Sequence, residues 1–129
     1  MAYKRIVYLS GPYRADTDYQ VNLHIAEFRK WAQIVLECGW AVIDPIAQTK
    51  WLDGCGVQPG QFIEADLTLI ERLIPGRDVM LMLKGHGDSD GAWSERDNAE
   101  DFGIAIMYAA SEAAVREWLL ANQEWRESA

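Results

Sequence analysis

One carboxylate, Glu95, stands where its type and spacing could do chemistry. A helical wheel of about 100° per residue places it on the apolar arc of the predicted helix 91–102. The apolar residues of that arc are Ala92, Ala99 and Phe102. A carboxylate that points with them toward a core or cleft needs a partner or a chemical function. The pattern also fits an ordinary glutamate at the edge of the stripe.

A second carboxylate, Asp66, occupies the same kind of position. In the predicted helix 61–74, it lies inside a wide apolar arc, between Leu73 and Ile70 on the wheel. A buried, hydrogen-bonded aspartate that fixes a loop would give the same pattern. Two carboxylates on the apolar faces of successive helices are nevertheless harder to assign to packing alone.

A glycine-containing turn, Ser10–Arg14, follows the first predicted strand. Glycine lets backbone N–H groups come close to a phosphate at the start of a helix. A plain strand-to-helix loop has the same composition. Arg14 is either a phosphate clamp or a solvated loop residue, and composition does not choose between them.

The elements that must position these residues alternate between strand and helix. Strands are predicted at 5–9, 40–43, 79–83 and 104–107, and helices at 18–38, 61–74, 91–102 and 111–127. This order predicts a small doubly wound parallel sheet, flavodoxin- or Rossmann-like, of four to five strands flanked by helices. Ligands of such sheets bind outside the carboxyl ends of the strands at the switch point. There the segments 10–14 and 84–91 should meet.

Residues 47–60 are rich in glycine and are predicted to form a long loop anchored by Trp51 and Leu52. Loops of this length in a compact domain are often lids or interface elements.

The length, net charge and cysteine content of the chain argue against several classes of function. A chain of 129 residues predicts a single domain over 1–129, and the net charge of −8 argues against nonspecific DNA binding or an anionic membrane surface. No signal peptide or membrane span is expected. Cys38 and Cys55 form no metal or redox motif, although a disulfide is possible. We expect a cytoplasmic protein without a cofactor or metal.

Four short motifs, in order along residues 4–104, resemble the nucleoside 2-deoxyribosyltransferase superfamily. This superfamily includes the 2′-deoxynucleoside 5′-monophosphate N-glycosidases and small, often phage-borne relatives. The motifs are Tyr8-Leu-Ser-Gly-Pro-Tyr-Arg14, the stretch from Asn22 through Gly39 to Pro45, Phe62-Ile-Glu-Ala-Asp66-Leu67, and Ser89-x-Gly91-Ala92-x-x-Glu95 followed by Ala99 and Gly103.

The resemblance implies cleavage or exchange of an N-glycosidic bond. Glu95 would be the nucleophile that attacks C1′ of the sugar, and Asp66 the acid that binds sugar hydroxyls and assists proton transfer to the departing base. An oxocarbenium-like transition state uses two such carboxyl groups, with pKa values pushed apart. Water then gives hydrolysis, and a second base gives transfer. The substrate would also contact Gly11, Pro12, Tyr13, Arg14, Ser89 and Gly91.

The segment before Glu95 bears on the substrate. Monophosphate-specific relatives carry a serine six residues before the glutamate, as Ser89 does here. With Gly91 and Arg14, this serine would suit a 5′-phosphate, so we favour a nucleoside 5′-monophosphate over a nucleoside. Asp88 and Asp90 would repel a phosphate that they faced. Ser89 could equally be only an N-cap.

Some features depart from the superfamily. The insertion 71–77 lengthens the gap after Asp66, and Trp93 and Arg96 are expected to reshape the base pocket. Relatives often complete each site with a residue from a neighbouring subunit, so we expect a homo-oligomer, a dimer or higher. The closing helix, with its tryptophans, could be an interface or a domain cap. The alternative function is a non-catalytic nucleotide-binding module, in which Glu95 would be held by a salt bridge.

Overall fold

The computed structural model describes residues 3–52 and 54–125. Their strands are β1 (Tyr3–Lys4), β2 (Ile6–Ser10), β3 (Ala41–Ile43), β4 (Val79–Met82), β5 (Ala105–Tyr108) and β6 (Glu124–Trp125). Their helices are α1 (Asp18–Glu37), α2 (Pro45–Thr49), α3 (Pro59–Glu71), α4 (Asp90–Asp101) and α5 (Glu112–Ala121), with short 3₁₀ turns η1 (Lys50–Leu52) and η2 (His86–Asp88). None of these helices is long and apolar enough to cross a membrane.

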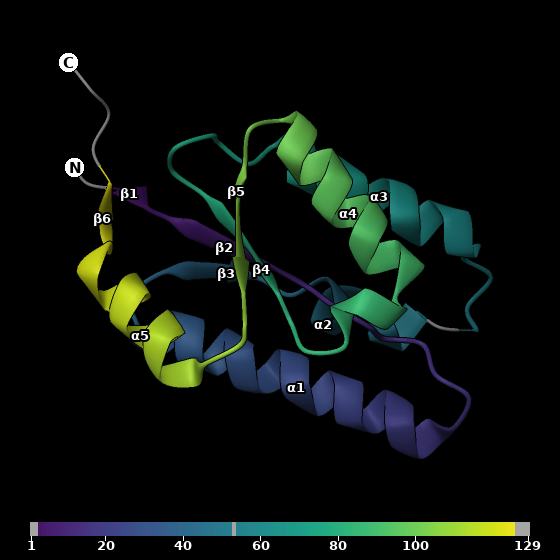
Figure 1. Ribbon diagram of the computed structural model, residues 1–129. Helices are drawn as coiled ribbons and strands as arrows, with labels where there is room; N and C mark the ends of the chain where they lie inside the picture. Colours follow the sequence, from purple (N-terminus) through teal and green to yellow (C-terminus); the bar gives the residue numbers. More distant parts are fainter. Residues whose placement is uncertain (1–2, 53, 126–129) are drawn as a thin grey trace.

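Four parallel strands form the main sheet in the order β3-β2-β4-β5 (Figure 1). The chain leaves β2 through α1 to reach β3 on one side, then returns through α3 to β4 on the other. Helices α1 and α5 cover one face, and α3 and α4 cover the opposite face. This arrangement confirms the predicted doubly wound fold, and its switch point lies between the carboxyl ends of β2 and β4.

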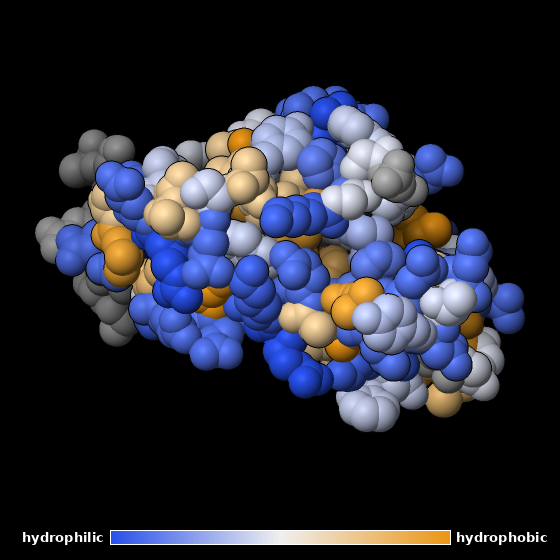
Figure 2. Space-filling model, turned by 60° about the horizontal axis from the view of Figure 1, so that its bottom comes forward, coloured by the Kyte–Doolittle hydropathy of each residue, from blue (hydrophilic) through white to orange (hydrophobic). Residues whose placement is uncertain are grey.

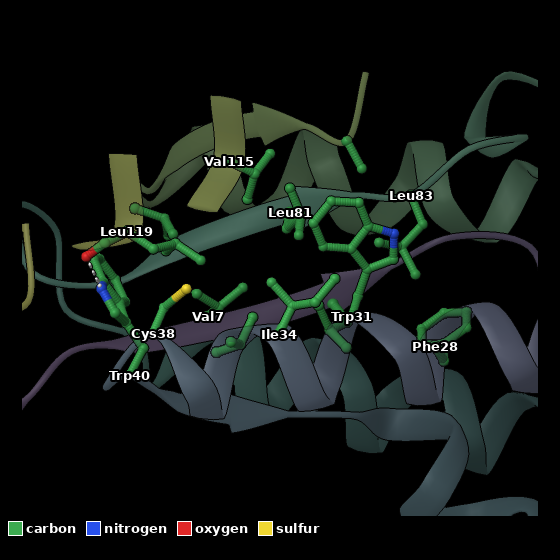
Figure 3. Packing of buried hydrophobic residues seen from close by; sticks show 14 residues of the cluster. Val7, Phe28, Trp31, Ile34, Cys38, Trp40, Leu81, Leu83, Val115 and Leu119 are labelled. Atoms are coloured by element: carbon green, nitrogen blue, oxygen red, sulfur yellow. Dashed lines mark hydrogen bonds between the residues drawn. The ribbon is translucent and has the colours of Figure 1, made fainter. Parts of the chain in front are cut away.

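Side chains of β2 alternate between the two layers, as a strand requires. Val7 and Leu9 pack into the cluster beneath α1 and α5, where Trp31 fills the centre (Figure 3). Tyr8 belongs to the opposite cluster, beneath α3 and α4. Ser10 follows Tyr8 on that same face and is fully buried. A tyrosine and a serine therefore point toward the helices that carry the two predicted carboxylates.

The predicted loop 47–60 is partly wrong, because residues 45–52 form α2 and η1. Asp44 caps α2 by accepting hydrogen bonds from the backbone N–H groups of Ile46 and Ala47. Pro at the first helical position favours the same start. Trp51 and Leu52 are 79% and 44% exposed, so they do not anchor the segment.

The closing helix is shorter than predicted. It ends at Ala121, and Trp125 lies in β6, paired with Tyr3 of β1; residues 126 and 127 lie outside the described part of the chain. Leu119 is buried, and its carbonyl accepts a hydrogen bond from the Trp40 indole at 2.8 Å (Figure 3). Helix α5 therefore caps the core of its own domain.

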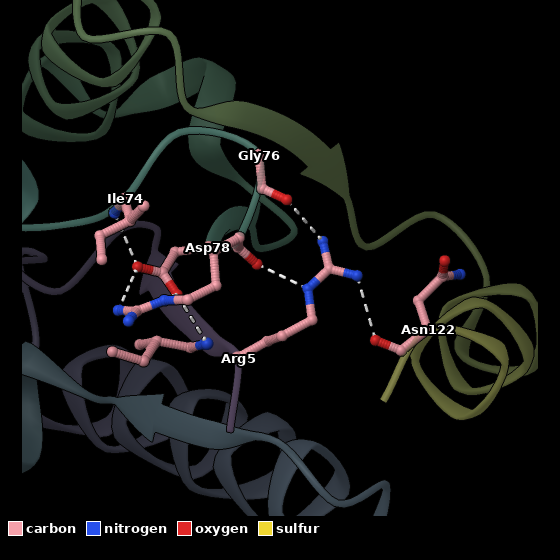
Figure 4. A network of polar contacts seen from close by, with 7 residues as sticks. Arg5, Ile74, Gly76, Asp78 and Asn122 are labelled. Atoms are coloured by element: carbon pink, nitrogen blue, oxygen red, sulfur yellow. Dashed lines mark hydrogen bonds and ion pairs between the residues drawn. The ribbon is translucent and has the colours of Figure 1, made fainter. Parts of the chain in front are cut away.

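A polar network closes the amino ends of the strands (Figure 4). The Arg5 guanidinium donates to the backbone carbonyls of Arg77 at 2.6 Å and Asn122 at 3.1 Å. The buried Asp78 carboxylate accepts from the N–H groups of Ile6 at 3.0 Å and Ile74 at 2.7 Å. These bonds hold together the edge of the domain that lies opposite the switch point.

Candidate active site

A cavity of about 500 Å³ opens at the carboxyl ends of β2 and β4. All eight residues predicted for the site lie on its wall: Gly11, Pro12, Tyr13, Arg14, Asp66, Ser89, Gly91 and Glu95. The other lining residues are Ile46, Thr49, Pro59, Phe62, Ile63, Asp90 and Ala92. The cavity is thus mostly apolar, with polar groups in the loop after β2, at the start of α4, and in the middle of α3 and α4.

The two loops expected to meet at the switch point pack closely. The N–H of Leu83 donates to the Ser10 carbonyl at 2.7 Å, which extends the pairing of β2 with β4. A Cβ atom on Gly11 would lie 3.0 Å from the Leu83 Cβ. Gly85 has a φ of +84°, and its Cβ would lie 3.1 Å from Pro12. Glycine at both positions lets the loops form one wall of the cavity.

Glu95 projects from α4 toward the end of β2. Its Oε2 accepts a hydrogen bond from the Tyr8 hydroxyl at 2.5 Å, and its Oε1 accepts one from the Ser10 hydroxyl at 3.0 Å. Ala92 and Ala99 on the same side of α4 are buried, as the wheel predicts, whereas Phe102, the third apolar residue of that arc, is the C-cap of α4 and is 44% exposed. Both carboxylate oxygens are therefore held by donors from the neighbouring strand.

Our reading of the sequence missed Tyr8 as a site residue. The signal was available, because a tyrosine in a buried strand needs a partner for its hydroxyl. Residues two apart in a strand also share a face, so Tyr8 and Ser10 could have been assigned to the same layer. What the sequence did not show was that this layer faces Glu95.

Burial raises the pKa values of both carboxyl groups, and the negative charge of Asp66 adds to the effect at Glu95. Burial raises the pKa of Glu95 to about 7, with a smaller contribution from the negative charge of Asp66, while the Tyr8 and Ser10 hydrogen bonds act in the opposite direction. Burial also raises the pKa of Asp66 to about 6. The Tyr8 pKa lies well above its ordinary value, mainly through burial and the neighbouring Glu95, so its phenol stays protonated as a donor.

Ser89 acts as the N-cap of α4. Its hydroxyl accepts a hydrogen bond from the Ala92 N–H at 3.1 Å, which is the structural role that the sequence left open. It also lies on the cavity wall beside Gly91, with Arg14 on the wall as well. Asp90 lines the same cavity and works against an anion there. Of the Asp88 side chain the structure describes nothing.

Most of the chain matches one known family. The family described as a domain of unknown function, DUF4406, matches residues 5–108. The chain belongs to the DUF4406 family. No curated protein matches it.

Two solved structures resemble this DUF4406 chain in fold. The solution structure of BlsM has 15% sequence identity and a TM-score of 0.55, over 93% of this chain and 90% of that chain. A de novo designed Rossmann fold protein, ROS2_835, has 17% identity and a TM-score of 0.40, over 94% and 99% of the two chains. At such identity, the BlsM likeness shows a shared fold alone.

Two bulky residues of the DUF4406 chain do not border the cavity as predicted. Trp93 stacks against the Arg96 guanidinium at 4.0 Å from the ring centroid, and its ring lies 5.7 Å from His86. Arg96 pairs with Asp97 at 3.1 Å. Trp93 and Arg96 are two residues and one residue from Glu95, and neighbouring residues of a helix point about 100° apart, so these two side chains lie on other sides of α4 than Glu95.

His24 of α1 has a role that the sequence did not indicate. Its Nδ1 lies 2.9 Å from the Tyr13 carbonyl, within hydrogen-bonding distance. A helical histidine without a second histidine or cysteine at ligand spacing is predicted to be a surface or half-buried residue, and His24 is half-buried. Here it ties the loop after β2 to α1, and so helps to position the cavity wall.

Proposed function

We propose that this DUF4406 chain cleaves or exchanges the N-glycosidic bond of a nucleoside 5′-monophosphate or nucleoside. The observation that carries the proposal is the pair of carboxyl groups on one cavity, with Glu95 held by the Tyr8 and Ser10 hydroxyls. The four motifs that resemble the nucleoside 2-deoxyribosyltransferase superfamily support the same chemistry.

In this proposal Glu95 is the nucleophile. One of its oxygens attacks C1′ of the sugar, the C1′–N bond breaks, and the bonding electron pair goes to the base. Donors on both oxygens fix the carboxylate in one orientation before the substrate arrives, which is the preorganisation that nucleophilic attack needs. Water then releases the sugar from Glu95, whereas a second base would accept it.

Asp66 supplies the proton that the departing base takes up. Because the two pKa values are about 7 for Glu95 and about 6 for Asp66, the pair holds a proton near neutrality. The reactive form has Glu95 ionised and Asp66 protonated. This form is the less populated one, because the Glu95 pKa lies above that of Asp66, but both pKa values lie close enough to neutrality for the pair to exchange the proton.

The end of the cavity at α4 suits the 5′-phosphate. The Ser89 hydroxyl and the Gly91 N–H lie at the start of a helix, where backbone donors and the helix dipole favour an anion. Arg14 adds a guanidinium on the same wall. Asp90 opposes this attraction, and our preference for a monophosphate rests on the three favourable groups.

The alternative, a non-catalytic nucleotide-binding module, requires Glu95 to be neutralised by a cation. Arg96, the nearest arginine in sequence, pairs with Asp97. The Glu95 oxygens accept from neutral hydroxyl groups, which leave the carboxylate its charge and its nucleophilic character. This arrangement favours the enzyme.

Product analysis tests the proposal. The protein is incubated with deoxynucleosides, ribonucleosides and their 5′-monophosphates, with and without an acceptor base, and free base and new nucleosides are separated by chromatography. We expect base release from monophosphates, and its loss by at least about 10³-fold in Glu95→Gln. The matched control is Glu64→Gln, which changes an exposed glutamate on α3 and should keep full activity.

Other results of the product analysis would change or reject the proposed reaction. New nucleosides formed only with acceptor base would identify a transferase. No product from any donor, with nucleotide binding still measurable by calorimetry, would reject the enzyme for these substrates and favour the binding module. Activity that survives in Glu95→Gln would reject the nucleophile.

A further inference from the structure

A second cavity, also about 500 Å³, lies on the other side of the loop after β2. Its walls come from the loop after β2, one face of α1, and η1: Tyr13, Val21, Asn22, Ile25, Ala26, Arg29, Lys50 and Trp51. Tyr13 lines both cavities. The proposed reaction uses none of the other seven residues, so this cavity needs its own explanation.

The length of α1 explains why the cavity exists. Helix α1 has 20 residues and spans about 30 Å, whereas the five residues of β2 span about 16 Å. Helix α1 therefore extends past the sheet (Figure 1). Its apolar stripe is buried at Phe28 and Val35, but only half-buried at Val21 and Ile25. That uncovered part of the stripe forms the apolar floor of the second cavity.

The rim of the cavity is cationic and aromatic. Arg29 and Lys50 lie on it, and its described lining residues include no acidic side chain. The Lys50 ammonium lies 4.9 Å from the centroid of the Trp51 ring. This local positive charge stands out in a chain of net charge −8. Seen from the α1 side, the surface is mainly hydrophilic, with hydrophobic side chains breaking it in separate patches (Figure 2).

Trp51 gives the strongest sign that the cavity has an occupant. Its side chain is 79% exposed on a short 3₁₀ turn, where packing does not explain a large aromatic residue. An exposed indole beside an ammonium and a guanidinium suits a ligand with a flat ring and a negative charge, because rings stack on tryptophan and cations pair with phosphate or carboxylate.

We propose that this second cavity binds a small aromatic anion of the nucleotide class, with its ring on Trp51 and its anionic group between Arg29 and Lys50. The apolar floor at Val21 and Ile25 would receive the edge of the ring. A nucleic acid polymer fits less well, since the charge of −8 repels a long polyanion. The inference does not depend on the proposed enzyme activity.

The experiment follows the indole N–H resonance of Trp51 by ¹H–¹⁵N correlation NMR, assigned by its loss in Trp51→Phe. Adenosine 5′-monophosphate is the probe, with adenosine and inorganic phosphate as partial probes. The titration is repeated in Glu95→Gln, so that turnover cannot alter the probe. We expect a saturable shift with the monophosphate and a weaker response to either part alone.

Variants of the two cations test whether the Trp51 shift reports binding in this cavity. Arg29→Gln and Lys50→Gln should each weaken the apparent Kd reported by Trp51 about tenfold or more. The control Arg72→Gln removes an exposed cation outside both cavities and should leave the Kd unchanged. An unmoved Trp51 resonance, equal Kd values in all three variants, or a response only to single-stranded oligonucleotides would each overturn the proposal. Absence of base release from the wild-type protein, with the Trp51 shift intact, would reject the proposed reaction but not this site.

Discussion

At the scale of single residues, the geometry around Glu95 makes Tyr8 a positioning residue. The Tyr8 hydrogen bond lowers the Glu95 pKa and so favours the ionised nucleophile. In Tyr8→Phe we therefore expect kcat to fall about 10- to 100-fold. The acidic limb of the kcat/KM pH profile should move to higher pH. The control Tyr19→Phe changes an exposed tyrosine of α1 and should leave both unchanged. An unshifted acidic limb would show that Tyr8 acts only in packing.

The same carboxylate links activity to stability. The pKa of Glu95 rises from 4.5 to about 7 on folding, so the ionised group is less favourable in the folded protein than in the unfolded chain. Its favourable contribution is complete below about pH 4.5 and lost as the pH rises through about 7. Glu95→Gln should therefore raise the free energy of unfolding by roughly 1–3 kcal/mol at pH 8.

Urea denaturation at pH 8 and at pH 5 measures this effect. At pH 5 the wild-type carboxyl is mostly protonated, so the difference between the two proteins should shrink. A difference that is the same at both pH values would contradict the assignment, because a change of packing alone does not titrate.

Wheel positions were enough to select Glu95 and Asp66, because each side chain breaks an apolar pattern. They did not select Tyr8, which fits a buried strand by type and carries its signal only in the hydroxyl. Trp93 was expected near the cavity from its closeness to Glu95 in the sequence and not from its wheel position, and the helix turns it away. Site residues could be predicted from the sequence where a polar side chain occupies a position that the pattern otherwise fills with apolar residues.

At the scale of elements, the start of α4 combines a structural and a binding role in Ser89. Ser89→Ala removes the cap and should cost about 0.5–2 kcal/mol of stability. If the hydroxyl also contacts a 5′-phosphate, kcat/KM should fall more for monophosphates than for nucleosides, about 5- to 20-fold. Steady-state kinetics on both substrate classes measures the ratio.

Helix α5 offers a matched control for this prediction. Ser111 caps α5 in the same way, accepting from the Ala114 N–H at 3.2 Å, and does not line the cavity. Ser111→Ala should lose similar stability and keep the substrate preference. An equal loss of preference in both variants would assign the effect to general destabilisation.

Helices and strands with one clear period were predicted to within a few residues, except for the end of the closing helix, whereas α2 and η1 were not predicted. Asp44-Pro45 is a helix start as well as a strand end, and a five-residue helix has too few positions to show a period. The error concerned function too. Trp51, assigned to anchoring, is the exposed residue on which the second cavity depends.

At the scale of the whole molecule, the two ends of the sheet have different tasks. The carboxyl ends hold the carboxylates at raised pKa, at a cost in stability, while the amino ends are closed by Arg5 and Asp78. The fold class followed from the order of the elements. The different roles of the two sheet ends did not follow from that order, because Asp78 contacts Ile6 across 72 residues of sequence.

The last prediction separates these two ends. Asp78→Asn leaves one of its backbone donors, at Ile6 or Ile74, facing an amide NH₂ instead of an acceptor, and also breaks the ion pair with Arg77. We expect a loss of about 2–4 kcal/mol in the free energy of unfolding by urea. Because the network lies at the opposite edge of the sheet, kcat/KM at 20 °C should change less than about twofold.

The exposed pair of Arg96 with Asp97 is the control, and Asp97→Asn should cost under about 0.5 kcal/mol. A large fall in kcat/KM of a folded Asp78→Asn protein would mean that the two ends are coupled through β2 and β4.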